Sequence, residues 1–377
     1  MSMILNEQIA PNLTLFTFEN HLLGLDRNTS GIFEIFEDKG CIELKGFVNK
    51  GYAQNMSFSK VIVYSRKIYF IPYNCNEVCV YDVDGGAWTS IKVIEEKGSE
   101  LFYDAMLYKN RLFLFPFNYG QIIVVNTNTL EIEEKISLAD LCPSNLNNKM
   151  FIKHLQLDDE IILPIFSTNI LLRLSCENYQ IEKLDLNIDD LEINSITFGD
   201  DYIYLLSRNS LKVIKLTMNL EVVQEIKLEN DVAPMGNQYT YFDQSGFEYY
   251  DGKLFCFPAR WNHTVKIKTN ENRTELLNEL DELAFVKNDS ENVSKYNHGI
   301  VLNNKLYIMN FNNQIVVFDL HTEKYKTISV LNNDPNGISF RSFLQSIISS
   351  VSIIISKASS ISAISDICPT ESQLSTP

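Results

Sequence analysis

Short apolar stretches recur along the chain in a fixed order. One begins at Lys67 and reads KIYFIP, and another begins at Arg111 and reads RLFLFP. A short polar loop follows, then a second stretch that alternates apolar and polar residues, then a turn and a third stretch. Alternation with a period of two is typical of β-strands, because successive side chains of a strand point to opposite faces. The pattern therefore predicts three antiparallel strands in each copy.

A fourth strand is predicted immediately before each of these units. Two-residue turns connect it to the next strand, and Asp251-Gly252 and Asn303-Asn304 suit the positive φ angles of a type I′ hairpin. No helical pattern of about 10 to 15 residues separates the strands, which excludes a parallel sheet with crossover helices. Seven copies of the four-strand unit follow one another, and they span residues 13–48, 59–93, 103–138, 151–186, 194–228, 246–280 and 297–330.

One position marks the end of the second strand in every copy. The marker residues are Asp26, Pro72, Pro116, Pro164, Ser207, Pro258 and Asn310, which recur every 43 to 52 residues. That period is typical of a four-stranded propeller blade. A row of such sheets leaves two exposed end faces, and closing the row into a ring removes them. The predicted fold class is all-β, a seven-bladed β-propeller of four-stranded antiparallel blades. Six blades is the alternative if the first copy, which lacks the proline, lies elsewhere.

The composition changes after the last copy. We predict one propeller domain over residues 1–335 and a Ser/Ile-rich tail over residues 336–377, helical at first and disordered at its end. Apolar residues from Phe340 to Ile355 recur at helical spacing, which favours an amphipathic helix that docks on the ring or on a partner. Strand-prone isoleucine runs favour aggregation as the competing interpretation.

Charge and cysteine content narrow the function classes. The net charge is −16 and no cluster of Lys and Arg is present, so the field of the protein repels nucleic acid and anionic membranes. No run of about 18 apolar residues is free of charge, so no membrane-spanning helix is expected. The seven cysteines are scattered without a CxxC pair, and the N-terminal residues lack the features of a secretory signal. Buried free thiols in the cytoplasm are the prediction.

Two copies carry a recognisable repeat motif. The second reads IYFIP, a loop and VCVYD, with Trp88 seven residues after Tyr81; the seventh reads LYIMN and VVFD, with Tyr325 seven residues after Phe318. This spacing resembles the kelch repeat, in which the two aromatic side chains pack within one blade. The diglycine of that repeat is absent. The resemblance implies a divergent kelch-like propeller of bacterial type, and kelch-like proteins mostly bind partners while a minority are enzymes.

The loops between the second and third strands of the copies are predicted to share one face with the loops between blades. They are rich in Asn, Tyr, Trp and Arg, which offer amide hydrogen bonds and flat stacking surfaces. Ordinary turn chemistry is the alternative, because Asn and Asp favour turns by bonding their own backbone. The run 260–263 is favoured, since an exposed Trp beside an Arg is a frequent binding anchor. The candidates are Tyr73, Asn118, Tyr119, Arg208, Arg260, Trp261, Asn262, His263 and Asn310.

A second ring of candidates comes from the innermost strands, twelve residues before each marker. Its members are Thr14, Lys60, Asp104, Ile152, Ser195, Gly246 and His298. We expect this ring near the mouth of the central channel, where Lys60, Asp104 and His298 form either a site or merely a solvated polar ring.

No recognised catalytic or metal-binding motif occurs, and no cofactor is predicted. The leading hypothesis is a non-catalytic binding or interaction module for a protein, peptide or glycan. The alternative is a carbohydrate-active propeller enzyme, a lyase or hydrolase, that uses the residues at the channel mouth.

Overall fold

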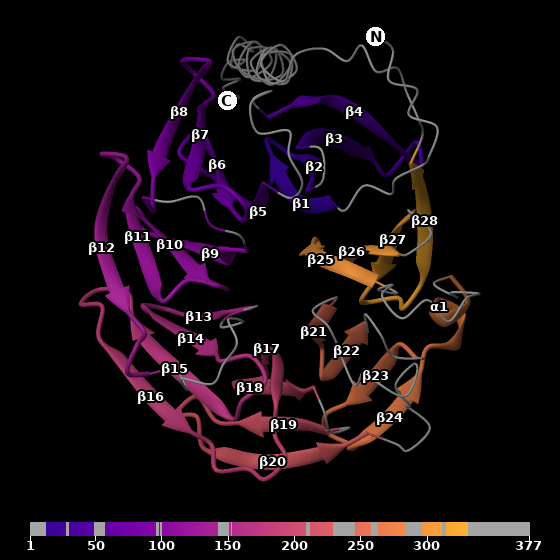
Figure 1. Ribbon diagram of the computed structural model, residues 1–377. Coiled ribbons are helices and arrows are strands. Elements are labelled where there is room, and N and C mark those ends of the chain that lie inside the picture. Colours follow the sequence, from indigo (N-terminus) through magenta and orange to yellow (C-terminus); the bar gives the residue numbers. More distant parts are fainter. Residues whose placement is uncertain are drawn as a thin grey trace, which may run out of the picture.

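The computed structural model describes residues 13–27, 30–48, 57–95, 98, 100–141, 151, 153–208, 212–228, 246–257, 263–283, 296–310 and 314–330. Within them, 28 strands form seven groups of four consecutive antiparallel strands. The groups are arranged as the blades of a ring around a central opening (Figure 1). The prediction of a seven-bladed β-propeller is confirmed, and the first copy is one of its blades.

We name the blades A to G in chain order. Blade A contains β1 (Leu13–Phe18), β2 (His21–Asp26), β3 (Gly31–Phe36) and β4 (Cys41–Phe47); blade B contains β5 (Phe58–Tyr64), β6 (Lys67–Pro72), β7 (Glu77–Asp82) and β8 (Ala87–Lys92). Blade C contains β9 (Phe102–Tyr108), β10 (Arg111–Pro116), β11 (Gln121–Asn126) and β12 (Glu131–Ser137); blade D contains β13 (Leu155–Leu157), β14 (Glu160–Pro164), β15 (Ile170–Ser175) and β16 (Ile181–Asp185).

The remaining blades repeat this order. Blade E contains β17 (Ile193–Gly199), β18 (Tyr202–Ser207), β19 (Lys212–Leu216) and β20 (Val222–Lys227). Blade F contains β21 (Gly246–Tyr250), β22 (Lys253–Phe257), β23 (Val265–Lys268) and β24 (Arg273–Leu276), and the helix α1 (Asn278–Leu283) follows it. Blade G contains β25 (Tyr296–Leu302), β26 (Lys305–Asn310), β27 (Gln314–Asp319) and β28 (Tyr325–Val330).

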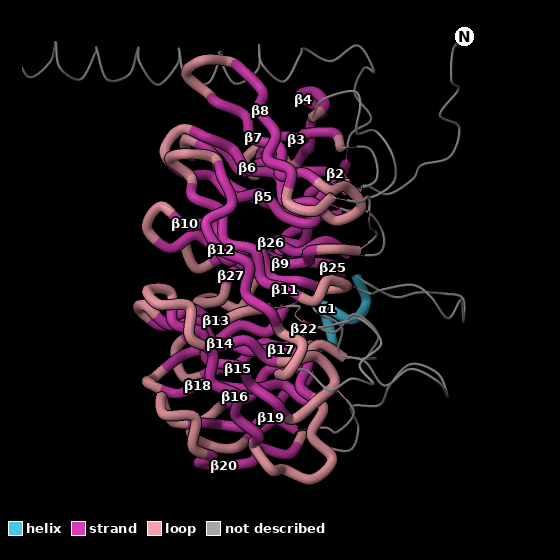
Figure 2. Tube along the Cα trace, turned by 60° about the vertical axis from the view of Figure 1, so that its left-hand side comes forward, coloured by secondary structure: helices cyan, strands magenta, loops and turns pink. Residues whose placement is uncertain are grey.

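The first strand of each blade lies at the central opening and the fourth lies at the circumference (Figure 1). In blade A the start of β1 pairs with the end of β2, at Leu13 and Asp26. The loop between the second and third strands therefore lies on the same face as the connections between blades, as predicted. We call this the mouth face. The helix α1 lies on this side of the ring, which Figure 2 shows from the side.

Most of the inner hairpins turn through residues with positive φ. Both turn residues have positive φ at Asp251-Gly252 and Asn303-Asn304, which confirms the two type I′ sequences. Asp200-Asp201 shares this conformation, and so do Glu19-Asn20 and Ser65-Arg66, which the sequence pattern does not single out. These tight turns fix the register between the first and second strands, and so they decide which residues reach the channel.

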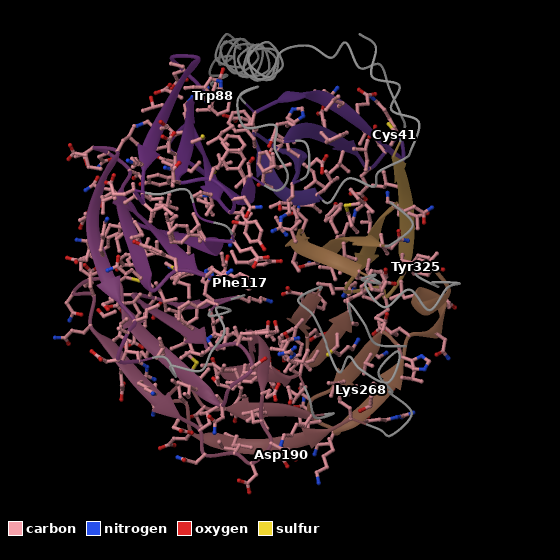
Figure 3. The ribbon with its side chains drawn as sticks, viewed as in Figure 1. Cys41, Trp88, Phe117, Asp190, Lys268 and Tyr325 are labelled. Carbon is pink, nitrogen blue, oxygen red and sulfur yellow. The ribbon has the colours of Figure 1, made fainter. Side chains whose placement is uncertain are left out.

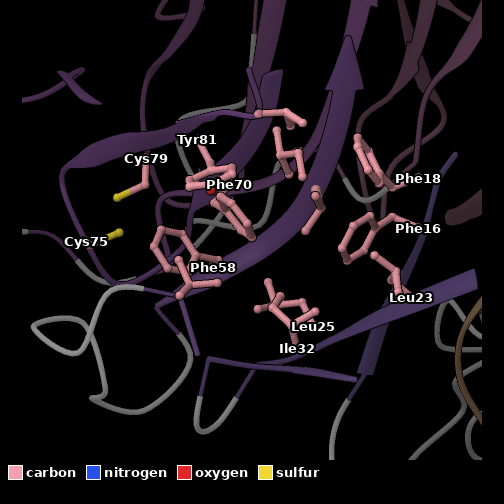
Figure 4. Close-up of a cluster of buried hydrophobic side chains, with 14 residues drawn as sticks. Phe16, Phe18, Leu23, Leu25, Ile32, Phe58, Phe70, Cys75, Cys79 and Tyr81 are labelled. Atoms are coloured by element: carbon pink, nitrogen blue, oxygen red, sulfur yellow. The ribbon is translucent and has the colours of Figure 1, made fainter. Parts of the chain in front are cut away.

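The hydrophobic core lies between the blades rather than at the centre of the ring. Between blades A and B, the side chains of Phe16, Leu25 and Ile32 face Phe58 and Phe70 in one buried cluster (Figure 4). The rings of Phe58 and Phe70 are 5.7 Å apart between centroids. Each fully buried side chain of this size contributes about 1.5–3 kcal/mol through removal of apolar surface from water. A blade therefore depends on its neighbours for stability.

Charged pairs repeat the same contact at three interfaces between blades. A cation at the start of a second strand contacts a glutamate in the turn between the third and fourth strands of the next blade. The pairs are Arg111–Glu177, Lys253–Glu323 and Lys305–Glu37. The last pair joins blade G to blade A. The contact that closes the ring is therefore the same one that joins blades along the chain.

Blades A and G also pair directly through their outer strands. β28 runs parallel to β4, with Ser329 opposite Cys41 and Val330 opposite Ile42. Among the described residues, every blade is a set of four consecutive strands, so no described strand of one end of the propeller completes a blade of the other end. The seam between blades A and G thus combines a short backbone ladder with the charged contact.

The aromatic pairs of the second and seventh copies lie opposite each other on neighbouring strands, Tyr81 with Trp88 and Phe318 with Tyr325. The ring centroids of Tyr81 and Trp88 are 4.9 Å apart. Trp88 and Tyr325 lie at the circumference of the ring (Figure 3). The expected packing within one blade is thus present at Tyr81 and Trp88.

Five cysteines fall within the described residues, and all five are buried thiols outside any disulfide: Cys41, Cys75, Cys79, Cys176 and Cys256. Burial raises the pKa of the Cys176 thiol to about 12, which keeps it protonated and unreactive. Among the described residues, no helix has the length and apolar character needed to cross a bilayer. The predicted tail over residues 336–377 lies outside the described residues.

A close approach between blades E and F requires glycine at position 199. A Cβ atom there would lie 1.8 Å from the ring of Tyr249, which stacks on Tyr204 at 5.6 Å between centroids. We expect Gly199→Ala to lower the free energy of unfolding by about 1–3 kcal/mol, because the ring of Tyr249 must leave its stack. Urea unfolding measures the change. Gly120→Ala is the matched control, since no described residue other than its chain neighbours lies within 4 Å of its added Cβ. An equal loss of stability in both variants would contradict the packing argument.

Candidate functional site

A cavity of about 370 Å³ occupies the central channel, and each of the seven blades contributes to its lining. This volume falls within the range of small-molecule sites, about 300–1,000 Å³. The lining is asymmetric. Charged side chains come mainly from blades B, C and D, whereas the wall formed by blades E, F, G and A contains the small residues Ser195, Gly246, Gly299 and Thr14.

Asp104 is the centre of the first charged group in this cavity. Its side chain is only 9% exposed. Oδ1 accepts hydrogen bonds from Lys60 Nζ and from the backbone N–H of Ala105, and Oδ2 lies 2.5 Å from His154 Nδ1 and accepts the backbone N–H of His154 at 3.2 Å. Burial alone would raise the pKa of Asp104, but the charges and hydrogen bonds of His154 and Lys60 outweigh it and lower the pKa far below its usual range. We call Lys60, Asp104 and His154 the Asp104 cluster.

The contact with Asp104 fixes the orientation of the His154 ring. The ring also packs on Phe115, with 5.0 Å between centroids, and the side chain is 16% exposed. Among the described residues, no hydrogen bond reaches Nε2. A carboxylate on Nδ1 holds that nitrogen as the donor and leaves Nε2 for a ligand in the cavity.

A second charged pair crosses the channel. Lys153, just before β13 in blade D, donates from Nζ to the carbonyl oxygen of Phe247 at 2.9 Å and to Oε1 of Glu248 at 3.1 Å, both in β21 of blade F. The two blades are not adjacent, because blade E lies between them. The lysine side chain therefore spans part of the opening and narrows it.

Aromatic side chains of blades B, C and D lie beside the cavity on the mouth face. Tyr103 lines the cavity, and its ring lies 5.9 Å from that of Tyr73 and 5.2 Å from that of Phe117. Tyr73, Phe117 and Phe166 form one buried cluster against which Tyr103 packs. We call these four residues the aromatic rim. Figure 3 labels Phe117 beside the central opening.

Two arginines lie over the aromatic rim. The guanidinium of Arg27 is 5.1 Å from the ring centroids of both Tyr73 and Tyr103, and that of Arg208 is 4.7 Å from the centroid of Phe166. Such a contact restrains a long side chain and keeps its charge next to the ring. Both guanidinium groups are therefore held at the mouth of the channel, with Glu192 4.0 Å from Arg208.

The structure brings together most of the ring predicted from the inner strands. Five members of this ring line the cavity, and each pairs with a residue at the same level of the second strand of its own blade. They are Thr14, Lys60, Asp104, Ser195 and Gly246. The ion pair between Lys60 and Asp104 joins blades B and C within this ring. His298 lies in β25, and its side chain is outside the described residues, as is the whole of Ile152.

The residues predicted in the loops occupy different environments. Tyr73 belongs to the aromatic rim and its hydroxyl donates to Glu100 at 3.0 Å. Arg208 stacks on the rim, donates to the Ser167 hydroxyl and lies 4.0 Å from Glu192. Asn118 donates to Glu100 at 2.9 Å. These contacts place Tyr73 and Arg208 at the channel mouth and Asn118 just beside it.

Other predicted loop residues lie apart from the cavity. The Tyr119 hydroxyl donates to Gln121 at 3.0 Å, while its ring packs on Phe102. Asn310 is 2% exposed, and it bonds to Gln314 of its own loop and to the carbonyl oxygen of Leu283. His263 is half-buried. The other three residues of the favoured run, Arg260, Trp261 and Asn262, lie outside the described residues.

Sequence reasoning missed Lys153, His154 and Glu248 as members of the site. In blade D, Leu157 pairs with Glu160, and β14 is one residue shorter than the corresponding strands of blades A, B and C. In this shorter hairpin, the residue that reaches the cavity ring lies ten positions before the marker Pro164, where the other hairpins place it twelve positions before their markers. His154 therefore occupies the level predicted for Ile152. Counting backward from the Asp158-Asp159 turn would have found it.

The described residues include no group of three or more His, Cys, Asp or Glu side chains placed to hold a metal ion. The polar groups of the cavity instead bond to one another in ion pairs. Fixed donors, acceptors and an aromatic ring in one cavity can bind and orient a polar ligand without further rearrangement.

No family model matches the sequence, and no curated protein matches it. The fold is similar to solved propeller structures. Virginiamycin B lyase from Staphylococcus aureus is 14% identical, with a TM-score of 0.59 and coverage of 82% of this chain and 94% of the lyase. Apo AztD from Citrobacter koseri is 13% identical, with a TM-score of 0.51 and coverage of 88% and 87%.

A third similar structure is the extracellular domain of a putative one component system from B. thetaiotaomicron. It is 9% identical, with a TM-score of 0.57, and the match covers 88% of this chain and 43% of that one. An enzyme and a sensor domain are thus both similar in fold. At these identities the likeness establishes the propeller fold, and the role of this chain must come from its own site.

Proposed function

We propose that this protein is a non-catalytic binding module that captures a peptide, a glycan or a protein segment at the mouth of its central channel. One observation carries the proposal: a cavity of ligand size to which each of the seven blades contributes and in which charged groups are held in place. Ligands bind to such preorganised clefts with little loss of conformational entropy.

Polar and apolar features of the cavity support this proposal. Tyr103 offers a flat ring, held by Tyr73 and Phe117, on which a sugar or a planar side chain can stack. Lys60, Lys153 and His154 offer hydrogen bonds around it. We further propose that the protein is a divergent, kelch-like propeller of bacterial origin that works in the cytoplasm, in keeping with its repeat pattern and buried thiols.

Replacement of Tyr103 tests the site. A thermal-shift screen with peptides and glycans identifies ligands, because a ligand that binds only the folded state raises the Tm. We expect Tyr103→Leu, which retains apolar bulk but lacks the flat ring, to weaken binding of such a ligand about tenfold, as loss of one stacking contact. Val223→Ala, on the exposed face of β20, is the control and should bind as the wild type does. Unchanged affinity in Tyr103→Leu would refute the assignment of the cavity.

The Asp104–His154 contact favours an enzyme as a second candidate, a lyase or hydrolase that acts on a carbohydrate. A histidine held at 2.5 Å by a buried carboxylate has the arrangement of a general base. Turnover lost in His154→Gln with substrate affinity retained would support catalysis. Loss of affinity in that variant, without any turnover in the wild type, would support the binding module.

A further inference from the structure

We propose that the cavity selects a small organic anion, whose carboxylate or phosphate group binds among Lys60, Lys153 and His154. This inference rests on the proposed function and specifies the ligand. Lys60 and Lys153 reach the cavity with side chains that are 31% and 34% exposed, and His154 reaches it with one that is 16% exposed. The three come from blades B and D, on the charged side of the lining.

The hydrogen bonds already formed in the cavity leave an excess of donors. An ammonium group has three N–H donors. Lys60 uses one, on Asp104, and Lys153 uses two, on Phe247 and Glu248. Within the described surroundings, three ammonium donors of the two lysines therefore remain for a ligand, and Nε2 of His154 adds a fourth when its ring is protonated.

The carboxylate oxygens of the cavity are largely occupied. Asp104 accepts four hydrogen bonds, two at each oxygen. Glu248 accepts a hydrogen bond from Lys153 at Oε1. Among the described residues, no hydrogen bond reaches its Oε2, the remaining oxygen of the two carboxylates. A ligand that supplies acceptors therefore matches the cavity better than one that supplies donors. Carboxylate and phosphate groups consist of acceptors and form the stronger, charge-assisted hydrogen bonds.

Charge in and around the cavity does not oppose an anion. The two lysines balance Asp104 and Glu248 inside the cavity. At the entrance, Arg27 and Arg208 lie over the aromatic rim, while Glu192 lies 4.0 Å from Arg208 and Glu100 accepts a hydrogen bond from Tyr73. The net charge of the whole chain is −16, but charges separated by more than about 8 Å are largely screened at physiological ionic strength. The donors that the lysines leave in the cavity therefore decide whether an anion binds.

The opposite wall provides space for the rest of the ligand. Ser195, Gly246 and Gly299 have small side chains or none, and Tyr103 provides a ring beside them. A volume of about 370 Å³ suits one sugar ring or a few residues of a peptide rather than a folded partner. An acidic or phosphorylated sugar, or a similarly sized organic acid, combines the required charge with a body of this size.

Matched probes test the choice of an anion. Glucuronate and glucose differ by one carboxylate on the same ring, and glucose 6-phosphate and inorganic phosphate separate carboxylate from phosphate recognition. We expect glucuronate, glucose 6-phosphate or both to bind the full chain at least tenfold more tightly than glucose in calorimetric titrations. Equal affinity for glucose and both sugar anions would overturn the selectivity while leaving a channel-mouth site in place. No binding of any of the four probes would also overturn the inference, and the peptide and glycan screen would then judge the proposed function separately.

Lys153 is the position for the matched variants, since it lies outside the Asp104 cluster. We expect Lys153→Met to weaken binding of the anionic probe about tenfold or more, with unchanged affinity for glucose, and Lys153→Arg to restore part of the loss. Lys92→Met is the control, because Lys92 lies on the outer strand β8 and, within the described part of the chain, its ion pair is with the exposed Glu95. Urea midpoints establish that each variant is folded. Wild-type affinity for the anion in folded Lys153→Met would refute the inference.

Discussion

Asp104→Asn is expected to lower the free energy of unfolding by about 2–4 kcal/mol, one of the largest effects available at the channel. The substitution retains the shape of the side chain but removes the charge that Lys60 and His154 share. Removing one partner from a buried ion pair typically costs about 3–5 kcal/mol, because the remaining charge is left uncompensated. The expected loss here is somewhat smaller, because the side chain of Lys60 is 31% exposed and water can hydrate its ammonium group in the variant. Urea unfolding at pH 7 measures the change.

The sign of the pKa shift makes a second check possible. The pKa of Asp104 is lower in the folded protein than in the unfolded chain, so its contribution to stability is present at neutral pH and declines as the pH falls. The difference between wild type and Asp104→Asn should therefore shrink in acid. Asp190→Asn, an exposed position at the circumference (Figure 3), should leave stability unchanged at both pH values. Wild-type stability in Asp104→Asn would contradict the account of the cluster.

Glu37→Gln is expected to weaken the seam between blades A and G. Glu37 accepts hydrogen bonds from Lys305 and Tyr307, both at 2.5 Å, and lies 3.0 Å from Lys326. Burial alone would raise the pKa of Glu37, but these three contacts outweigh it and lower the pKa to about 2 from the ordinary 4.5. With allowance for solvent screening of a side chain that is 27% exposed, the expected loss is about 1–2 kcal/mol at pH 7.

The pH dependence identifies the charge as the cause. A lowered folded-state pKa gives stability that is fully present above the unfolded value and lost as the pH falls to about 2. Urea unfolding of wild type and Glu37→Gln should thus differ most above about pH 5 and converge near pH 2. Glu95→Gln, at an exposed pair on the outer surface, should show no measurable change at any pH. A difference that persists at pH 2 would point to packing rather than charge.

The fold could be predicted because its signals are local. Alternating strands, two-residue turns and a constant spacing identify each blade, and the burial of apolar faces between neighbouring sheets requires a ring. The placement of Lys60 and Asp104 at the channel mouth followed from the same spacing, since each pairs with the residue one position before the marker at the end of its second strand. Where the hairpins have equal length, the sequence alone places a side chain at the channel.

The rest of the site depends on departures from that regularity. His154 reaches the cavity because one hairpin is shorter, and fixed spacing cannot register such a change. Glu248 joins the site because Lys153 is long enough to cross the channel past blade E, a contact between residues 95 positions apart. The aromatic rim likewise forms from side chains of three separate loops and of strand β9. Such contacts depend on the closed three-dimensional ring and have no signature within any one repeat.

The order of the strands within each blade determines where the chain could be opened and its ends rejoined. Each blade consists of four consecutive strands, and the junction of blades A and G uses a lateral ladder and the same kind of charged contact found at two other junctions. Nothing in this hydrogen bonding requires the polypeptide to start at blade A. A circular permutant that begins at blade D, with blade G linked to blade A, should therefore assemble the same propeller.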